Sequence, residues 1–224
     1  NESEPPPRWS PDGRYLAFLS GRQDARVTQL WLLERAGGEA TKRSDLKGDI
    51  EGYAWSPDAR RIAMVVKDAE PGADDTSKTK IPKPIVVERY QFKKDIDGYM
   101  GARRSHLYLL DVASGKVDTL TRGAYDEALP AWSPDGKQIV FQGYNSGIND
   151  LYIVDLATGK LRQLTNDKYA EMQPQWSPDG RTIAFTTDRG PDSNLDLLTF
   201  DEWHIGTYDL ATSRIEILPN QAGL

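Results

Sequence analysis

Apolar and polar residues alternate with a period of two along most of the chain, in short runs separated by turn-forming residues. Residues 151–155 (LYIVD) form one such run, and the sequence ATGK at 157–160 follows it. Successive side chains of a strand point to opposite faces, so this pattern indicates strands with two differently buried faces. Helical periodicity is lacking, and the pattern therefore predicts an all-β chain.

A phrase of the type Trp-Ser-Pro-Asp-Gly opens four repeated units. It begins at Trp9, Trp55, Trp132 and Trp176. Proline suits the second position of a tight turn and glycine suits a site with positive φ, so each phrase predicts a hairpin. A further apolar run ends in an acidic residue 21 positions before each next tryptophan. Four short strands in about 40–45 residues, repeated, are typical of β-propeller blades.

The repeat predicts one β-propeller domain or fragment, residues 1–224, of about four four-stranded blades. The units run over about 9–54, 55–131, 132–175 and 176–224. Four blades make up part of a propeller ring, half of a ring, or a small complete ring. A small closed ring, an open arc and the pairing of two chains into an eight-bladed ring remain alternatives. An unpaired arc would expose strand edges and favour association.

The units differ in length only between their second and third strands. The second unit carries an insertion at about residues 68–105, and the fourth a shorter, acidic one at 188–203. The apolar run at 85–87 is short and β-branched, so we expect an added hairpin in the second unit. Insertions in repeat proteins emerge on one face, often the binding face. The basic insertion is suited to a carboxylate or an acidic surface, although a solvated hairpin would carry similar charges.

Two positions depart from the repeat. Ala59 stands where the other three units have the turn glycine, which costs about 1 kcal/mol if φ is positive there. Arg43-Ser44 replaces the Leu-Thr pairs at 120–121 and 164–165. Either the strand end is exposed at Arg43, or the arginine has a partner.

Composition excludes several functions. With 34 acidic and 28 basic residues the net charge is −6, which argues against a nucleic-acid binder. No apolar run is long enough for a membrane span. The absence of cysteine excludes disulfides and thiolate sites and suits the bacterial cytoplasm and periplasm alike. His106 and His204 stand apart, so each is expected to be a hydrogen-bonded rim residue rather than a ligand. We expect no metal and no cofactor.

Catalytic motifs are also missing. The string GYNSG at 143–147 has the wrong spacing for a nucleophile elbow, and phosphate-binding loops are absent. The aspartates of the repeated turns are expected to be structural, because they recur with the turn and hold its backbone. They are Asp12, Asp58, Asp135 and Asp179. We predict no catalytic residue in this chain.

The tryptophan-centred units resemble TolB-type propeller repeats. Residues 1–127 also resemble part of the N-terminal propeller of the prolyl-oligopeptidase family, in its acylaminoacyl-peptidase-like branch. The similar segments are 1–4 (NESE), 8–20, 84–92 (PIVVERYQF), 97–99 (DGY) and 103–108 (RRSHLY). Residues 128–224 are similar to generic TolB-type propellers, notably at 173–189 and 194–209. In the peptidase family the propeller, usually of seven or eight blades, caps a separate α/β-hydrolase domain and admits only peptides.

The resemblance implies a non-catalytic segment that gates or binds peptide for a hydrolase domain in the parent protein, absent from this chain. Arg89, Arg103 and Arg104 are candidates to hold a peptide carboxylate through bidentate hydrogen bonds, and Tyr90 and Tyr99 to pack on the peptide. One alternative is a TolB-type protein–protein interaction scaffold. Another is an engineered half-propeller that self-assembles, as a homodimer or larger oligomer that completes the ring.

Overall fold

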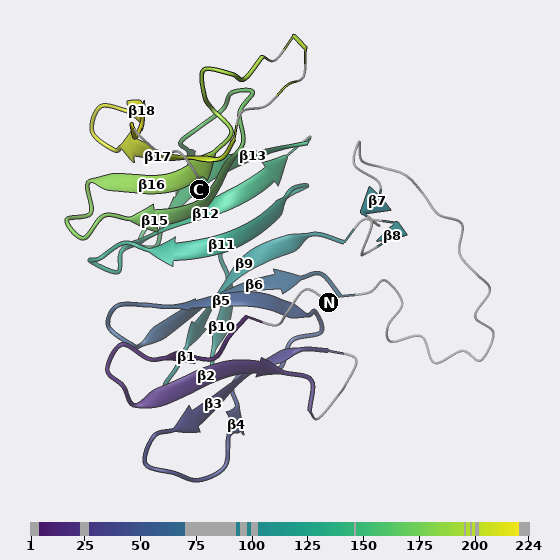
Figure 1. Ribbon diagram of the computed structural model, residues 1–224. Helices are drawn as coiled ribbons and strands as arrows, with labels where there is room; N and C mark the ends of the chain where they lie inside the picture. Colours follow the sequence, from purple (N-terminus) through teal and green to yellow (C-terminus); the bar gives the residue numbers. More distant parts are fainter. Residues whose placement is uncertain are drawn as a thin grey trace.

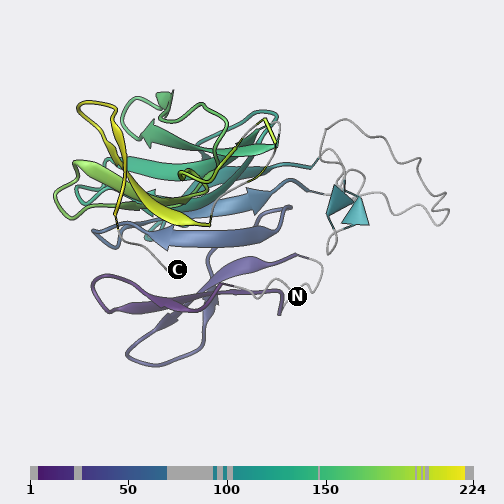
Figure 2. The same cartoon turned by 45° about the horizontal axis from the view of Figure 1, so that its top comes forward.

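The computed structural model describes residues 5–22, 27–69, 93–94, 98–99, 103–145, 147–194, 196–197, 199 and 202–219. These residues form four four-stranded antiparallel sheets and one two-stranded sheet, and none of them is helical. The prediction of an all-β propeller of about four blades is confirmed. The sheets follow one another as an open arc with sheets 1 and 4 at its two ends (Figures 1 and 2).

Each four-stranded sheet is an antiparallel meander whose strands are neighbours in chain order. Sheet 1 contains β1 (Arg8–Trp9), β2 (Tyr15–Ser20), β3 (Gln29–Glu34) and β4 (Thr41–Lys42). Sheet 2 contains β5 (Ile50–Trp55), β6 (Arg61–Lys67), β9 (Ser105–Asp111) and β10 (Val117–Thr119). Sheet 3 contains β11 (Asp126–Trp132), β12 (Gln138–Asn145), β13 (Ile148–Asp155) and β14 (Leu161–Gln163). Sheet 4 contains β15 (Glu171–Trp176), β16 (Thr182–Thr187), β17 (His204–Asp209) and β18 (Ile215–Ile217).

The repeated tryptophan ends the first strand of each sheet. Trp55, Trp132 and Trp176 are the last residues of β5, β11 and β15, which begin at residues 50, 126 and 171. Unit boundaries placed at the tryptophans therefore cut each sheet inside its first strand, and the sheets span 8–42, 50–119, 126–163 and 171–217. The length differences lie between the second and third strands, as the repeat predicts.

The turn after each tryptophan has one geometry in all four sheets. Gly13, Gly136 and Gly180 have φ of 69°, 69° and 70°, and Ala59 has φ of 58°. Each turn aspartate accepts hydrogen bonds from the serine hydroxyl two residues before it and the main-chain N–H two residues after it. The pKa of all four carboxyls is lowered, and the main cause is the hydrogen bond from the serine hydroxyl. The four are Asp12, Asp58, Asp135 and Asp179.

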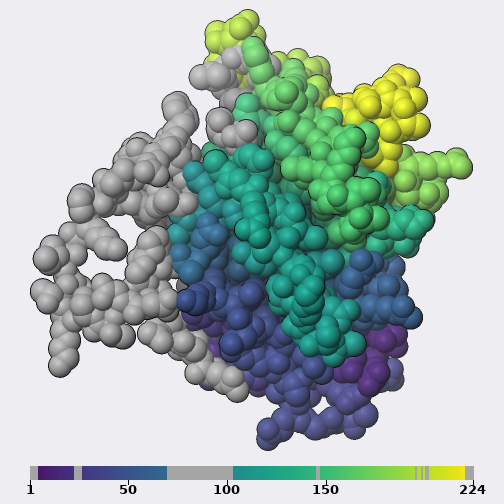
Figure 3. Space-filling model, turned by 180° about the vertical axis from the view of Figure 1, so that it is seen from behind, coloured from purple at the N-terminus to yellow at the C-terminus, as the bar shows by residue number. Residues whose placement is uncertain are grey.

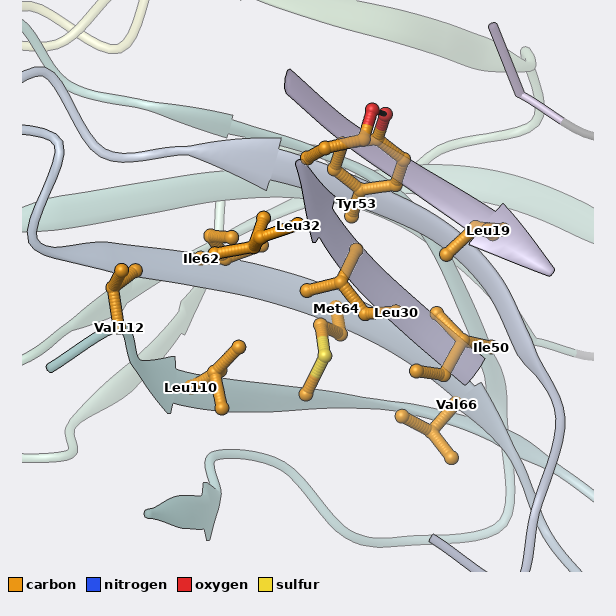
Figure 4. Packing of buried hydrophobic residues seen from close by; sticks show 11 residues of the cluster. Leu19, Leu30, Leu32, Ile50, Tyr53, Ile62, Met64, Val66, Leu110 and Val112 are labelled. Atoms are coloured by element: carbon orange, nitrogen blue, oxygen red, sulfur yellow. Dashed lines mark hydrogen bonds between the residues drawn. The ribbon is translucent and has the colours of Figure 1, made fainter. Parts of the chain in front are cut away.

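The core lies between the sheets, because each sheet is apolar on both faces. We call the face toward the preceding sheet its leading face and the face toward the next sheet its trailing face. Between sheets 1 and 2, Leu30 and Leu32 on β3 pack against Met64 and Ile62 on β6 (Figure 4). Two similar clusters lie between sheets 2 and 3 and between sheets 3 and 4. Figure 3 shows the sheets from behind, layered in chain order.

The insertion of sheet 2 contains a short hairpin. β7 (Lys93–Lys94) pairs antiparallel with β8 (Gly98–Tyr99), and both lie between β6 and β9 in the chain. The apolar run at 85–87, on which the expectation of a hairpin rested, lies outside the described residues. The observed pair brackets residues 95–97 instead.

Candidate functional site

The insertion leaves the arc at the edge where the second strands end and the third strands begin, which we call the insertion edge. Arg103 and Arg104 lie there, immediately before β9. Arg103 donates from Nε to the Asp68 main-chain oxygen at 2.7 Å, and its Nη2 lies 3.3 Å from Asp49 Oδ2. Arg104 Nη1 lies 3.5 Å from Asp126 Oδ2, while its main-chain N–H donates to Asp68 Oδ2 at 3.0 Å. Both side chains are largely buried, so a peptide carboxylate must share them with aspartates of this chain.

The other peptide-binding candidates are not brought to this pair by the described residues. Arg89 and Tyr90 lie outside them. Tyr99 is in β8, opposite Lys93, and the structure describes its backbone only. A five-residue peptide site therefore stays a prediction, with Arg103 and Arg104 as the adjacent members.

A buried carboxylate lies beside these arginines. Glu127, at the start of β11, is 1% exposed, and its Oε2 accepts hydrogen bonds from the Leu107 N–H at 3.0 Å and from the Thr121 hydroxyl. Thr121 Oγ1 also accepts from the Leu107 N–H, at 2.8 Å. A residue of sheet 3 thus holds the ends of two strands of sheet 2. Buried carboxylates need such donors, since leaving one unpaired is costly.

His106 is next to this carboxylate. Its Nδ1 lies 3.8 Å from Glu127 Oε2, and the residue is only 7% exposed, so it is buried rather than on the rim. Glu127 raises the pKa of His106, and burial opposes that effect. His204 begins β17 and is half-buried.

Sheets 3 and 4 meet through an equivalent acid. Glu171, at the start of β15, is fully buried and lies 3.2 Å from Arg189 Nη2. Arg189 also pairs with Asp167, and its guanidinium lies 4.3 Å from the centre of the Tyr169 ring. Burial, reinforced by the charge of Asp167, raises the pKa of Glu171 to about 7, although Thr165 and Arg189 act against it.

The junction of sheets 1 and 2 uses neutral groups instead. Ser44 Oγ accepts from the Leu30 N–H at 2.9 Å and donates to Gln29 Oε1 at 2.8 Å. Ile50 occupies the position of the two acids and is buried in the core. Neighbouring Arg43 is partly buried, and among the described residues its Nε has no hydrogen-bond partner.

We call this repeated feature the hydroxyl clamp: the side-chain hydroxyl of Ser44, Thr121 or Thr165 accepts from a leucine N–H of the third strand. The clamp was missed in the sequence, although a signal exists. Each hydroxyl lies 11 positions before a repeated tryptophan, and Glu127 and Glu171 lie five positions before one.

The described residues show neither a cluster of metal ligands nor a membrane-spanning helix. In that part of the chain, no three His, Asp or Glu side chains are arranged to hold a metal ion. The same residues contain no helix long and apolar enough to cross a membrane.

Comparison with known proteins agrees with this architecture. The family model described as "TolB beta propeller domain" matches residues 98–202. The chain is 39% identical over 138 residues to "Uncharacterized peptidase YuxL" of Bacillus subtilis, covering 60% of this chain and 21% of that protein. It is 41% identical over 164 residues to the Tol-Pal system protein TolB of Francisella tularensis, covering 62% of this chain and 35% of that protein. The chain thus spans about a fifth to a third of these relatives.

Solved structures share the fold. TolB from Acinetobacter baumannii matches with a TM-score of 0.61 and 20% identity, over 96% of this chain and 43% of that one. The Pyrococcus horikoshii acylaminoacyl peptidase matches with a TM-score of 0.66 and 18% identity, over 95% and 31%. Residues 98–202 thus match a TolB-type β-propeller domain, and the chain is similar both to TolB proteins and to proteins named as peptidases, with which it shares the propeller fold.

Proposed function

We propose that this chain is a non-catalytic propeller segment that selects peptides for a serine peptidase of the prolyl-oligopeptidase type. The observation that carries the proposal is the 39% identity to a protein named as a peptidase, over 138 residues. The chain spans 21% of that relative. In this proposal the hydrolase domain lies elsewhere in the parent protein. The insertion with its hairpin, at the edge that carries Arg103 and Arg104, is where the propeller would meet substrate.

Arg103 and Arg104 are suited to recognise a peptide carboxylate. Asp49 and Asp126 hold their guanidinium groups in place, and pre-ordered side chains lose less entropy when a ligand binds. A peptide carboxylate would join or displace these aspartates, since arginine can bind a carboxylate through two parallel N–H donors. Arg89, Tyr90 and Tyr99 would complete the site from the insertion.

Peptide binding to the 224-residue chain tests this proposal. We expect a peptide with a free C-terminal carboxylate to bind more tightly than its C-terminal amide in calorimetric titration. Arg104→Lys should abolish the difference, because lysine cannot make the bidentate contact. Arg214→Lys is the matched control, since Arg214 also pairs with an acid, the exposed Glu216, but lies in sheet 4, away from the proposed site. Equal binding of acid and amide, or no binding of either, would exclude the carboxylate site.

A second candidate is a protein–protein interaction scaffold, favoured by the 41% identity to TolB. The sequence of the parent reading frame after residue 224 discriminates between the two. A Gly-x-Ser-x-Gly elbow would support the peptidase segment. Further Trp-Ser-Pro-Asp-Gly units without such an elbow would support the scaffold.

A further inference from the structure

Arg189 fastens the start of the sheet 4 insertion to the junction of sheets 3 and 4. The insertion begins at residue 188, directly after β16. Arg189 pairs with Asp167 in the loop before β15, and its Nη2 lies 3.2 Å from Oε1 of Glu171 at the start of that strand. One guanidinium therefore joins the insertion both to a loop and to a buried carboxyl group of the junction.

Asp188 makes a second attachment beside it. Its Oδ1 accepts the Ala170 N–H at 2.9 Å, and its main-chain oxygen accepts the Ser193 hydroxyl at 2.5 Å. The Ser193 N–H also donates inside this turn, to the main-chain oxygen three residues before it, at 3.3 Å. Residues 188–194, which we call the latch segment, are thus held on the arc by their first two residues.

Three carboxyl groups interact beside Arg189. The residue before the clamped leucine is His106 in sheet 2 but Asp150 in sheet 3, and Asp150 is 6% exposed. Burial first, and then the negative charge of Asp167, raise the pKa of both Asp150 and Glu171. Repulsion between carboxyl groups favours the retention of a proton by one of them.

Glu171 has an oxygen atom without a hydrogen-bond partner. The residue is fully buried, and its Oε2 accepts no hydrogen bond from any residue that the structure describes. Burying an ionised carboxylate in this state is costly, whereas the protonated group needs fewer donors. Opening of the latch segment takes Arg189 away from Glu171 and admits water, which supplies those donors. Ionisation of Glu171 and opening of the latch segment therefore favour each other.

Other titratable groups lie on the elements around β15. Their charges act on the same equilibrium, so its assignment to Glu171 requires a variant of that residue alone. These groups are Tyr144 on β12, Asp150 on β13, Asp167 and Lys168 before β15, Asp188 and Arg189 after β16, and His204 on β17.

We propose that the latch segment is released from the junction when Glu171 loses its proton, so that attachment of the sheet 4 insertion depends on pH. The closed segment holds this proton more tightly than the open one, in agreement with the rise of the Glu171 pKa from 4.5 to about 7. Attachment is therefore strongest below pH 4.5 and weakens as pH rises to about 7. This proposal is independent of the proposed peptide function, because it involves no residue of the candidate peptide site.

Amide hydrogen exchange followed by NMR tests the release on the 224-residue chain. The exchange rates of Ala170 and Ser193, corrected for the intrinsic rate at each pH, report opening of the latch segment. We expect their protection to fall by up to about tenfold per pH unit between about pH 5 and 7, and to change little above pH 7.

Leu30 in sheet 1 is the reference for global unfolding, since its N–H is bonded within the neutral junction. Ala170 and Ser193 should exchange faster than Leu30, and low urea concentrations should not change their rates. Insensitivity to urea marks a local opening, because little surface is exposed.

Three substitutions assign the effect to individual residues. Glu171→Gln should abolish the pH dependence of protection at Ala170 and Ser193. Glu127→Gln, at the equivalent position of sheet 3, is the matched control and should leave that dependence in place. Arg189→Gln should lower the protection of Ser193 at every pH, because it removes the link itself. Thermal melting of each variant checks that it remains folded.

The wild-type chain alone can overturn the proposal. Protection at Ala170 and Ser193 that does not vary with pH would do so, and so would protection that follows the urea dependence of Leu30. A pH dependence that survives in folded Glu171→Gln would assign the titration to another group and would overturn it as well.

Discussion

The junction between sheets 1 and 2 and the junctions that follow it solve one problem with different chemistry. In each, a leucine N–H of the third strand needs an acceptor, and a serine or threonine hydroxyl provides it. Behind the hydroxyl, sheet 1 places the neutral amide of Gln29, whereas Glu127 and Glu171 place buried carboxylates at the next two junctions. The backbone of the repeat thus requires the hydroxyl, while the group behind it can vary.

The difference has consequences for stability. A neutral amide is cheap to bury, whereas a buried carboxylate carries a desolvation cost that its partners must offset. The charged junctions are therefore sensitive to the loss of a partner and to pH. The neutral junction relies on Ile50 and on Tyr53, whose hydroxyl donates to the Ala17 main-chain oxygen at 2.8 Å.

Removing the buried carboxylate of Glu127 should have the largest effect on stability. Glu127→Ala leaves the Thr121 hydroxyl and buried His106 without their carboxylate, and we expect a loss of about 3–5 kcal/mol in the free energy of unfolding. Gln29→Ala at the neutral junction should cost only about 1–3 kcal/mol. Urea denaturation measures both. Equal losses would show that charge is not what separates the junctions.

The charged junction of sheets 3 and 4 should also make stability depend on pH. Because the pKa of Glu171 is raised to about 7 from 4.5, the folded chain binds a proton more tightly than the unfolded chain, and stability falls as pH rises across that window. Its share is at most about 3 kcal/mol, since one pKa unit corresponds to roughly 1.4 kcal/mol. The raised pKa of His106 acts in the same direction, with stability present below about pH 6.5 and lost as pH rises through its folded pKa.

Glu171→Gln should flatten this slope between pH 4.5 and 7, as measured by urea denaturation at each pH. Ser44→Ala is the matched control, because it alters the neutral junction and should lower stability without changing the slope. A slope that survives in Glu171→Gln would assign the titration to other groups. Buried Asp150, whose pKa burial also raises, would be the next candidate.

The tryptophans sharpen the same comparison. Trp132 donates its indole N–H to Ala54, but Trp55, at the first junction, has a buried Nε1 without a partner among the described residues. Replacing either by phenylalanine removes the same volume. Trp132→Phe should therefore cost about 1–2 kcal/mol more than Trp55→Phe, since only the former leaves a carbonyl unpaired. Thermal melts of the two variants give the difference, and equal shifts would contradict it.

The repeat predicted what depends on local chemistry. The hairpin at each Ser-Pro-Asp-Gly phrase, the strands around it and the positive φ at Ala59 all follow from residues close together in the chain. The clamps did not follow, because Glu127 and Thr121 are strand-end residues whose meeting depends on how two sheets pack. Likewise, the pairing of Arg103 with Asp49 joins residues 54 positions apart, which no spacing in the repeat encodes.

The smallest expected effect concerns Ala59. At φ of 58° the backbone of Ala59 has a left-handed conformation that glycine adopts without steric cost. The other three turns have glycine at this position, with φ of 69–70°. Ala59→Gly should therefore stabilise the chain, by about 0.5 kcal/mol, because relief of strain exceeds the added freedom of the unfolded chain. The reverse change at the equivalent turn, Gly136→Ala, should destabilise it by about 1 kcal/mol. Paired urea curves measure both, and a loss of stability in Ala59→Gly would mean that unfolded-state entropy outweighs the strain at this turn.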